Sequence, residues 1–192
     1  MANVGGPRSS RRRLLMSAVQ SVLLYGAEVE QAALRVASAY RTVSEPAVLV
    51  IAGVIPVKLL AEERKAIYQR KGEIGKERAT SEERTRTYRQ WQELWDQETR
   101  GRWTARLTPM VQLWVKRRHG EVDYYLTQFL TGHGYFQSYL FLMRKTGSPD
   151  CIYCPGVPDD AEHTFFAAHI GKGPALRQHA LWVFFRWTLS VK

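Results

Sequence analysis

Two cysteines and a histidine near the end of the sequence have the types and spacing of metal ligands. Cys151 and Cys154 are the only cysteines in the chain, and eight residues separate Cys154 from His163. A CxxC pair lets two thiolates bind one metal ion from a tight turn. Pro155 and Gly156 favour a turn that brings the histidine back beside the thiolates. The sequence therefore predicts three ligands of a zinc site.

The fourth zinc ligand is the open question, because a structural zinc ion takes four protein ligands. In a knuckle of Cys-Cys-His-Cys type the fourth ligand would be a cysteine that follows His163 after four intervening residues, where this chain has Ala168. His169, the next residue, is the candidate substitute. The alternative is a broken site that leaves two ordinary reduced cysteines.

The charge of the chain favours polyanionic partners. Its 192 residues, enough for one compact domain or a domain with a small appendage, include 28 Lys and Arg against 18 Asp and Glu, a net charge of +10. We expect RNA or DNA as the partner, with a generic basic surface as the alternative. The basic residues expected to neutralise phosphate are Arg11, Arg12, Arg13, Arg102, Arg106, Lys116, Arg117 and Arg118.

Cysteine content and hydropathy restrict the compartment. Two closely spaced cysteines do not make a disulfide framework and fit a reducing environment. No apolar run reaches the roughly 20 residues that span a bilayer, so no membrane partner is expected. Arg11 to Arg13 precede a short apolar stretch, as in a signal peptide, but the helical pattern continues beyond it. We predict a nuclear or cytoplasmic protein that is not secreted.

The search for catalytic residues finds none. The sequence contains no glycine-rich phosphate loop and no convincing nucleophile, base and acid set. His119 and His133 lie beside glycines and lack a partner nearby in sequence, so they are assigned no role. Asp159 and Asp160 follow a turn and are expected to be solvated loop acids.

Helical periodicity indicates the elements that must position these residues. Segments 9–25, 33–43 and 57–71 show apolar residues at helical spacing, and the apolar run 47–55 is a helix or a strand, with helix favoured by Pro46. In 57–71 we expect Leu59, Leu60, Ile67 and Tyr68 inside and Glu62, Glu63, Arg64 and Lys65 outside.

The middle of the chain changes from polar to aromatic. The stretch KGEIGKERATSEERTR is apolar-poor and predicts a solvated linker or helix end. After it, aromatic and apolar residues recur at helical spacing and predict buried helix faces. They are Tyr88, Trp91, Trp95, Trp103, Leu107, Met110 and Trp114, followed after a Gly-His-Gly turn by Phe136, Leu140 and Met143. Tyr153 and Phe165, beside the metal ligands, are either base-stacking platforms or a small core.

Three blocks in the same order carry a resemblance to a known family. They read YRTVSEPAVLVIAGVIPVKLLAEERKAIY, RWTARLTPMVQLWVKRRHGEVDYYLTQFLTGHGYFQSYL and SPDCIYCPGVPDDAEHTFF. Together they resemble the carboxy-terminal part of the reverse-transcriptase polyprotein of a non-LTR (LINE-type) retrotransposon, with type-one elements that insert into ribosomal DNA as the nearest kin. The resemblance covers most of residues 4 to 166.

The resemblance implies a mainly α-helical fold, in which a helical thumb-like region precedes a small CCHC-like zinc-knuckle module and a disordered or atypical carboxy-terminal tail. We divide the chain into truncated thumb-like helices (1–79), a helical Trp-rich connection (80–146), the knuckle (147–170) and a divergent tail (171–192). Members of the family have about one further helix after a YGAEV-like segment. Their final cysteine is also missing here, and the sequence after Phe166 is unlike theirs.

The implied function is residual binding of RNA or DNA by a non-catalytic fragment. A polymerase holds two metal ions with carboxylates, and the family supplies these from a YxDD hairpin that this sequence lacks. An intact retrotransposon polyprotein is a further partner to consider. The alternatives are a zinc-stabilised protein-interaction module and a decayed copy with no function.

Overall fold

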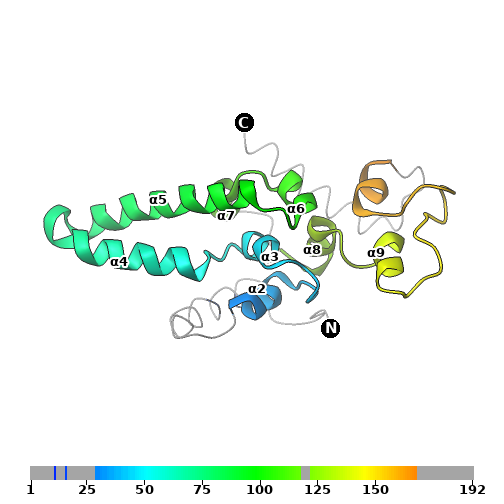
Figure 1. The fold of residues 1–192 in the computed structure, drawn as a ribbon, viewed down its shortest axis with the longest axis horizontal. Coiled ribbons are helices and arrows are strands. Elements are labelled where there is room, and N and C mark those ends of the chain that lie inside the picture. Colours follow the sequence, from blue (N-terminus) through cyan, green and yellow to red (C-terminus); the bar gives the residue numbers. More distant parts are fainter. Residues whose placement is uncertain (1–10, 12–15, 17–28, 118–121, 168–192) are drawn as a thin grey trace.

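The computed structural model describes residues 11, 16, 29–117 and 122–167, and what it describes is helical (Figure 1). Within these residues there is no strand, only an antiparallel bridge between Asp150 and Pro158. The mainly α-helical fold expected from the sequence is therefore confirmed. None of the helices in the described residues is both long enough and apolar enough to cross a bilayer. The helices are α2 (Val29–Ala37), α3 (Glu45–Ala52), α4 (Val57–Ile74), α5 (Lys76–Gln97), α6 (Arg102–Leu107), α7 (Val111–Lys116), α8 (Tyr124–Thr131) and α9 (Gln137–Leu142), followed by a π-helical turn, η1 (His163–Ala167).

Helix α3 forms the centre of the fold, and the ambiguous apolar run is helical, as favoured. Every residue from Ala47 to Ile51 is buried, because α2, α7 and α8 all contact this helix. A helix that is apolar on all sides requires such a central place. Pro46 lies in its first turn, and Gly53 ends it in the left-handed conformation. The segment after Ala37 is not helical, contrary to the periodicity, since Ser38 adopts a positive φ of 55°.

Helices α4 and α5 form a long antiparallel hairpin that extends away from α3 (Figure 1). Of the two interpretations of KGEIGKERATSEERTR, the linker is wrong and the helix end is correct for its first residues, because α4 ends and α5 begins within it. Only Gly75 interrupts the helices, with a φ of +83°. Charged side chains hold the two helices together. Glu63 forms an ion pair with Arg84 at 2.7 Å, and Glu83 forms an ion pair with Arg70. Both glutamates are buried, so a pattern that looked like a solvated charge run is an ionic seam.

The predicted inner face of α4 is therefore partly wrong. Leu59 and Leu60 are buried as expected, but Tyr68 is 72% exposed and Glu63 lies inside. Towards the tip of the hairpin the two helices contact each other, and no other helix of the described residues covers them (Figure 1). The interhelical ion pairs take the place of an apolar core there.

The aromatic residues of α5 and α7 are core residues, as predicted. Trp91 and Trp95 are buried, and the indole of Trp95 donates to the carbonyl of Thr108 at 3.0 Å. Trp114 of α7 lies against α3 and donates to the carbonyl of Ile51 at 3.3 Å. The indole N–H groups of Trp95 and Trp114 thereby find the partners that burial requires. Met110 differs from the prediction and is 52% exposed.

Helix α8 connects this helical body to the carboxy-terminal part of the described chain. The Asp123 carboxylate caps it by accepting from the Leu126 amide at 2.8 Å, and its central residue Phe129 is 1% exposed. In the following segment Phe136 is buried, as predicted, whereas Met143 is exposed. The chain then passes through α9 into a region of loop structure that contains the two cysteines.

Candidate metal centre and basic surface

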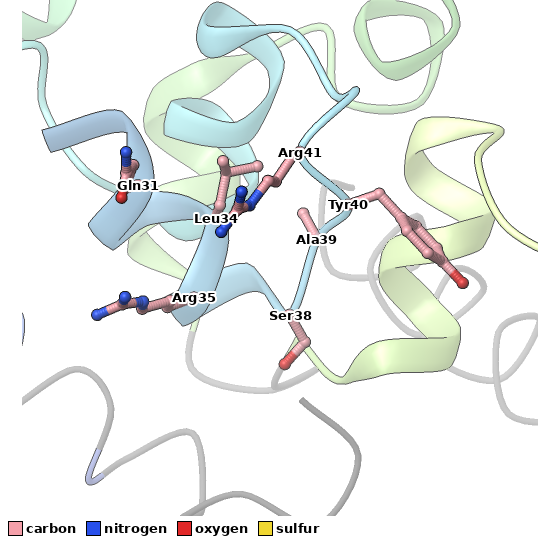
Figure 2. A pocket seen from close by; sticks show the side chains of 7 residues that line it. All are labelled: Gln31, Leu34, Arg35, Ser38, Ala39, Tyr40 and Arg41. Carbon is pink, nitrogen blue, oxygen red and sulfur yellow. The ribbon is translucent and has the colours of Figure 1, made fainter. Parts of the chain in front are cut away.

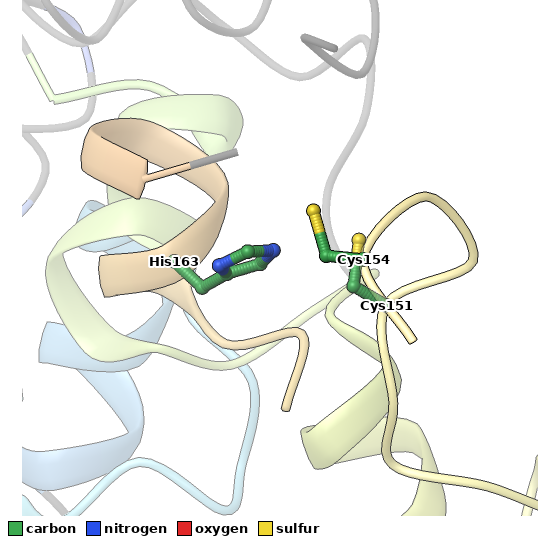
Figure 3. A group of neighbouring side chains, drawn as sticks. All are labelled: Cys151, Cys154 and His163. Carbon is green, nitrogen blue, oxygen red and sulfur yellow. The ribbon is translucent and has the colours of Figure 1, made fainter. Parts of the chain in front are cut away.

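Cys151, Cys154 and His163 come together at the end of the molecule opposite the hairpin tip (Figures 1 and 3). Their ligand atoms all lie within 4.8 Å of one another, and Figure 3 shows a ring nitrogen of the histidine turned toward the two sulfurs. In a tetrahedral zinc site, bonds of about 2.3 Å to sulfur and 2.0 Å to nitrogen separate ligand atoms by roughly 3.4–3.8 Å. The cluster thus needs only a small inward movement to hold one ion.

Backbone hydrogen bonds shape the loop that carries the cysteines. The amide of Cys154 donates to the carbonyl of Cys151 at 3.3 Å, and the amide of Val157 donates to Cys154 at 3.1 Å. The amide of Cys151 closes the loop by donating to Val157 at 2.8 Å. Gly156 allows the reversal with a φ of +77°. The CxxC segment is therefore a closed turn that presents both thiols from one side.

His163 has an unsatisfied buried nitrogen that a metal ion would satisfy. Its residue is 8% exposed, and no described residue offers a hydrogen bond to Nε2. A buried polar atom without a partner costs about 1–3 kcal/mol. The His163 backbone is fixed, because its amide donates to Oδ1 of Asp160 at 2.7 Å at the start of η1. Two thiols and this nitrogen are the donor set that zinc prefers, so the three residues fit such an ion.

Asp159 is not the solvated loop acid that the sequence suggested. It is completely buried, and its carboxylate accepts from the Gln137 amide at 2.9 Å and from the Thr164 hydroxyl at 2.7 Å. The side chain therefore joins α9 to η1 and fixes the metal-binding segment to the helices. Only Asp160 remains exposed, as expected. A buried role for one acid of an adjacent pair is set by tertiary packing, and the sequence carries no pattern that reveals it.

The two aromatic residues flanking the ligands have different environments. Phe165 is 3% exposed, and its ring centre lies 4.3 Å from that of Phe129 in α8. It is a core residue, so the idea of Phe165 as a base-stacking platform is wrong. Tyr153, between the cysteines, is 47% exposed and remains available for contact.

Part of the predicted site lies outside the described residues. His169, the candidate fourth ligand, lies outside the described residues, as do Arg12, Arg13 and Arg118. Their assignments remain predictions. Of the first basic cluster the structure describes Arg11, which is exposed and helical.

The remaining basic candidates line up on α6 and α7 but contact different neighbours. Arg102 donates to the Glu98 carbonyl at 3.0 Å. Arg106 makes two 2.9 Å bonds to the carboxylate of Glu162, which raises the pKa of Arg106 and lowers that of the acid. Arg106 was expected to neutralise phosphate, but in the structure Glu162 already balances its charge.

On α7 the cations are held against aromatic rings. Lys116 is exposed, with Nζ 5.4 Å from the centre of the Tyr88 ring. The guanidinium of Arg117 lies 3.6 Å from the ring centre of Trp114 and is only partly exposed. Lys116 therefore keeps its charge at the surface, while Arg117 contributes mainly to packing against α7.

A basic pocket that sequence reasoning missed lies at the end of α2 (Figure 2). It has a volume of about 130 Å³, and its lining includes Arg35 and Arg41. Figure 2 shows the Arg41 guanidinium turned back toward α2, while the Tyr40 ring points away from it. Among the described residues no carboxylate lies within 4.0 Å of either guanidinium. The positive φ of Ser38 reverses the chain and brings the two arginines together.

The sequence of the chain is similar to a protein of a mobile genetic element. It is similar to the retrovirus-related Pol polyprotein from type-1 retrotransposable element R1 2 of Nasonia vitripennis, with 32% identity over 139 residues. The aligned part covers 64% of this chain and 34% of the polyprotein, so the chain spans about a third of that relative's length. No family model and no solved structure matches. The expected origin is confirmed at the level of similarity to part of a non-LTR retrotransposon polyprotein.

Proposed function

We propose that this chain is a non-catalytic piece of a non-LTR retrotransposon reverse-transcriptase polyprotein that binds RNA or DNA. The observation that carries the proposal is the Cys151, Cys154 and His163 cluster within a chain of net charge +10 that resembles such a polyprotein. In this proposal zinc orders residues 148–167, called here the metal module, with His169 as the fourth ligand. The helices before it correspond to a thumb-like region.

The basic surface supplies the affinity in this proposal. Exposed arginines and lysines release counterions from nucleic acid when they neutralise phosphates, so binding weakens steeply with salt. Arg35 and Arg41 are the best-placed described pair, because no described carboxylate competes for them and both line one pocket. Arg102 and Lys116 add exposed charge. Arg106 contributes only where phosphate displaces Glu162.

The experiment measures binding of the purified chain to a fluorescent structured RNA and a matched DNA duplex across a salt series. We expect the affinity to fall linearly with salt on logarithmic axes. Replacing two phosphate contacts, in Arg35→Gln/Arg41→Gln, should reduce the slope on B-DNA by about 1.8. Chelating zinc should weaken binding further if the metal module contributes.

The matched control is Arg64→Gln/Arg89→Gln, which removes the same charge from exposed positions on the α4–α5 hairpin. Equal losses of affinity in both double variants would mean that a generic basic surface, and not this pocket, binds the nucleic acid. Absence of binding to either nucleic acid at low salt would refute the proposed function. Primer extension by the isolated chain would refute the non-catalytic part.

A second candidate, a zinc-stabilised protein-interaction module, is favoured by one observation. Apolar side chains are exposed on α9 and on the cysteine loop, including Leu142 at 72% and Ile152 at 67%. Such a surface is typical of a protein contact. This candidate predicts stoichiometric zinc together with little salt-dependent nucleic-acid binding. A decayed copy predicts neither zinc nor a cooperative unfolding transition.

A further inference from the structure

A second pocket, of about 400 Å³, lies where the helical body meets the metal module. Its lining includes Trp103 from α6, Gly132 and His133 after α8, Tyr139 from α9, and Asp160 and Glu162 before and within the last turn. We propose that this seam pocket binds an unpaired nucleobase that carries an amino group, with guanine preferred. The inference rests on the proposed function and names the part of the nucleic acid that this site takes.

The size of the seam pocket suits one nucleoside. Small-ligand pockets in proteins range over roughly 300–1,000 Å³, and this pocket lies near the lower limit. It has room for a single base and its sugar but not for a base-paired duplex. A base can enter it only when it is unpaired and unstacked, as in the loops and single strands that proteins recognise in RNA.

One wall of the pocket is an indole that is fixed in orientation. The Nε1 of Trp103 donates to the Phe129 carbonyl at 2.7 Å, and the two rings meet edge to face at 6.0 Å. Gly132 leaves its side of the indole without a side chain, because a Cβ at this position would lie 3.5 Å from Cδ1 of Trp103. The guanidinium carbon of Arg106 lies over the same ring, 5.3 Å from its centre. The φ of +68° at Gly132 further disfavours a side chain.

A second aromatic part of the lining is a stacked pair. The rings of His133 and Tyr139 lie 4.6 Å apart at an angle of 18°. The Thr42 hydroxyl contacts Nδ1 of His133 at 3.2 Å and the Tyr139 hydroxyl at 2.7 Å, which ties the pair to the segment after α2. Ordered aromatic rings stack on bases at little further cost in side-chain entropy.

The polar groups of the seam pocket select a base rather than a phosphate. Two carboxylates line it, and Asp160, which makes no ion pair with a described residue, disfavours phosphate, whereas the pocket at the end of α2 is lined by two arginines. Arg106 holds both oxygens of Glu162 at 2.9 Å. Asp160 uses Oδ1 for the His163 amide, and no described residue bonds its Oδ2. This exposed carboxylate can accept from an amino group, and guanine offers two adjacent N–H donors on one edge.

The test compares oligonucleotides that differ in one base. Wild-type protein, with zinc present, is titrated with a fluorescent single-stranded oligouridine, with the same strand carrying one central guanine, and with a duplex. We expect the guanine strand to bind more tightly than oligouridine. Free guanosine should compete with it, and uridine should not. Neither nucleoside should displace the duplex. No guanine preference in wild type would overturn the proposal without any variant.

Two substitutions separate stacking from hydrogen bonding. Tyr139→Leu should weaken binding of the guanine strand about tenfold, within the range for one lost base–aromatic stack, and leave duplex affinity unchanged. Tyr139→Phe, which keeps the ring, should behave as wild type. Asp160→Asn keeps an oxygen for the His163 amide but should abolish the preference for guanine over uracil. Tyr68→Leu, which changes an exposed aromatic residue on α4 outside the pocket lining, is the control.

The outcomes distinguish this inference from the proposed function. If wild type binds strands and duplex but Tyr139→Leu and Asp160→Asn do not change the base preference, the seam pocket is not a base site, although the chain binds nucleic acid. If wild type binds nothing at low salt, both proposals fail. If an arginine-containing peptide displaces the guanine strand and guanosine does not, the pocket serves a protein partner and the inference is wrong.

Discussion

The α4–α5 hairpin and the metal module lie at opposite ends of the described structure in space (Figure 1). They are stabilised by different kinds of interaction. The hairpin consists of helices of 18 and 22 residues, joined at Gly75 and held by many side-chain contacts. The metal module has one short π-helical turn and is otherwise loop. Its shape depends on a closed turn at Cys151, the buried Asp159 and the contacts of the Phe165 ring with Phe129 and Phe136.

Because of this difference, the two regions should respond differently to single substitutions. In the hairpin, stability is distributed over backbone hydrogen bonds and several ion pairs, so loss of one side chain removes a small part of the total. In the metal module, few interactions each fix several residues, and a bound ion would dominate. We therefore expect single substitutions to unfold the metal module while the same kind of change only weakens the hairpin.

The largest effect is expected from removal of a metal ligand. Cys154→Ser should abolish stoichiometric zinc binding and amide-exchange protection in 149–167, because structural zinc contributes about 10–16 kcal/mol in small zinc-binding peptides. Protection in 57–97 should persist. Zinc analysis and hydrogen exchange check this result. Tyr153→Ser, in the same loop but without a ligand atom, is the matched control, and retention of zinc by Cys154→Ser would contradict the assignment.

Loss of the buried carboxylate should come next. Asp159→Ala leaves the Gln137 amide and the Thr164 hydroxyl without their acceptor, and we expect a loss of about 3 kcal/mol in unfolding free energy. Asp159→Asn keeps part of the acceptor and should lose less. Urea denaturation followed by fluorescence measures both. The exposed Asp150 provides the control, and a loss in Asp150→Ala as large as in Asp159→Ala would refute the buried role.

The ionic seam of the hairpin should show a smaller effect. Arg70→Met removes one of two ionic partners of the buried Glu83, the other being Arg86, and because Arg70 is itself 39% exposed we expect only a moderate loss of unfolding free energy. Arg78→Met breaks a more exposed pair with Glu82 and should lower the unfolding free energy less. Both measurements use denaturant midpoints at low and high salt. Equal effects in the two variants would mean that burial of Glu83 adds nothing.

The smallest effect is a pH dependence of stability. It arises from His133, which lies between the hairpin and the metal module in the sequence. Burial lowers the pKa of His133 below its ordinary value of 6.5. The unfolded chain therefore binds a proton before the native state does, so stability should fall as the pH drops through about 6.5 and level off below the folded-state pKa. His133→Gln should remove this component. The difference between the urea midpoints of wild type and variant from pH 8 to 5 measures it, and parallel curves would contradict it.

Helix positions were the part most accessible to sequence reasoning. Apolar spacing identified α4 and the aromatic face of α5, because a helix shows its buried face in its own periodicity. For the apolar run that forms α3, Pro46 favoured a helix over a strand. It failed where polar residues make the contact. The stretch that forms the start of α5 looked like a linker, since nothing local indicates that Glu83 will meet Arg70 from the preceding helix.

In the candidate sites, the sequence predicted ligands but not surroundings. Cys151, Cys154 and His163 were identified from residue type and spacing, and the structure brings them together. No pattern in the sequence indicated the Arg35 and Arg41 pocket. These arginines line one pocket because the chain reverses after α2, where Ser38 has a positive φ. The guanidinium of Arg106 was assigned to phosphate, yet it pairs with Glu162, 56 residues away in sequence.

By itself the sequence determined a basic, mainly helical chain with a CxxC and histidine set, similar to part of a retrotransposon polyprotein. These properties are local or compositional, so they can be read without knowing which segments touch. Only the tertiary structure decided that Asp159 is buried, that Phe165 is core and that two pockets of opposite charge exist. Burial and pairing depend on residues distant in sequence, and packing alone brings those residues together.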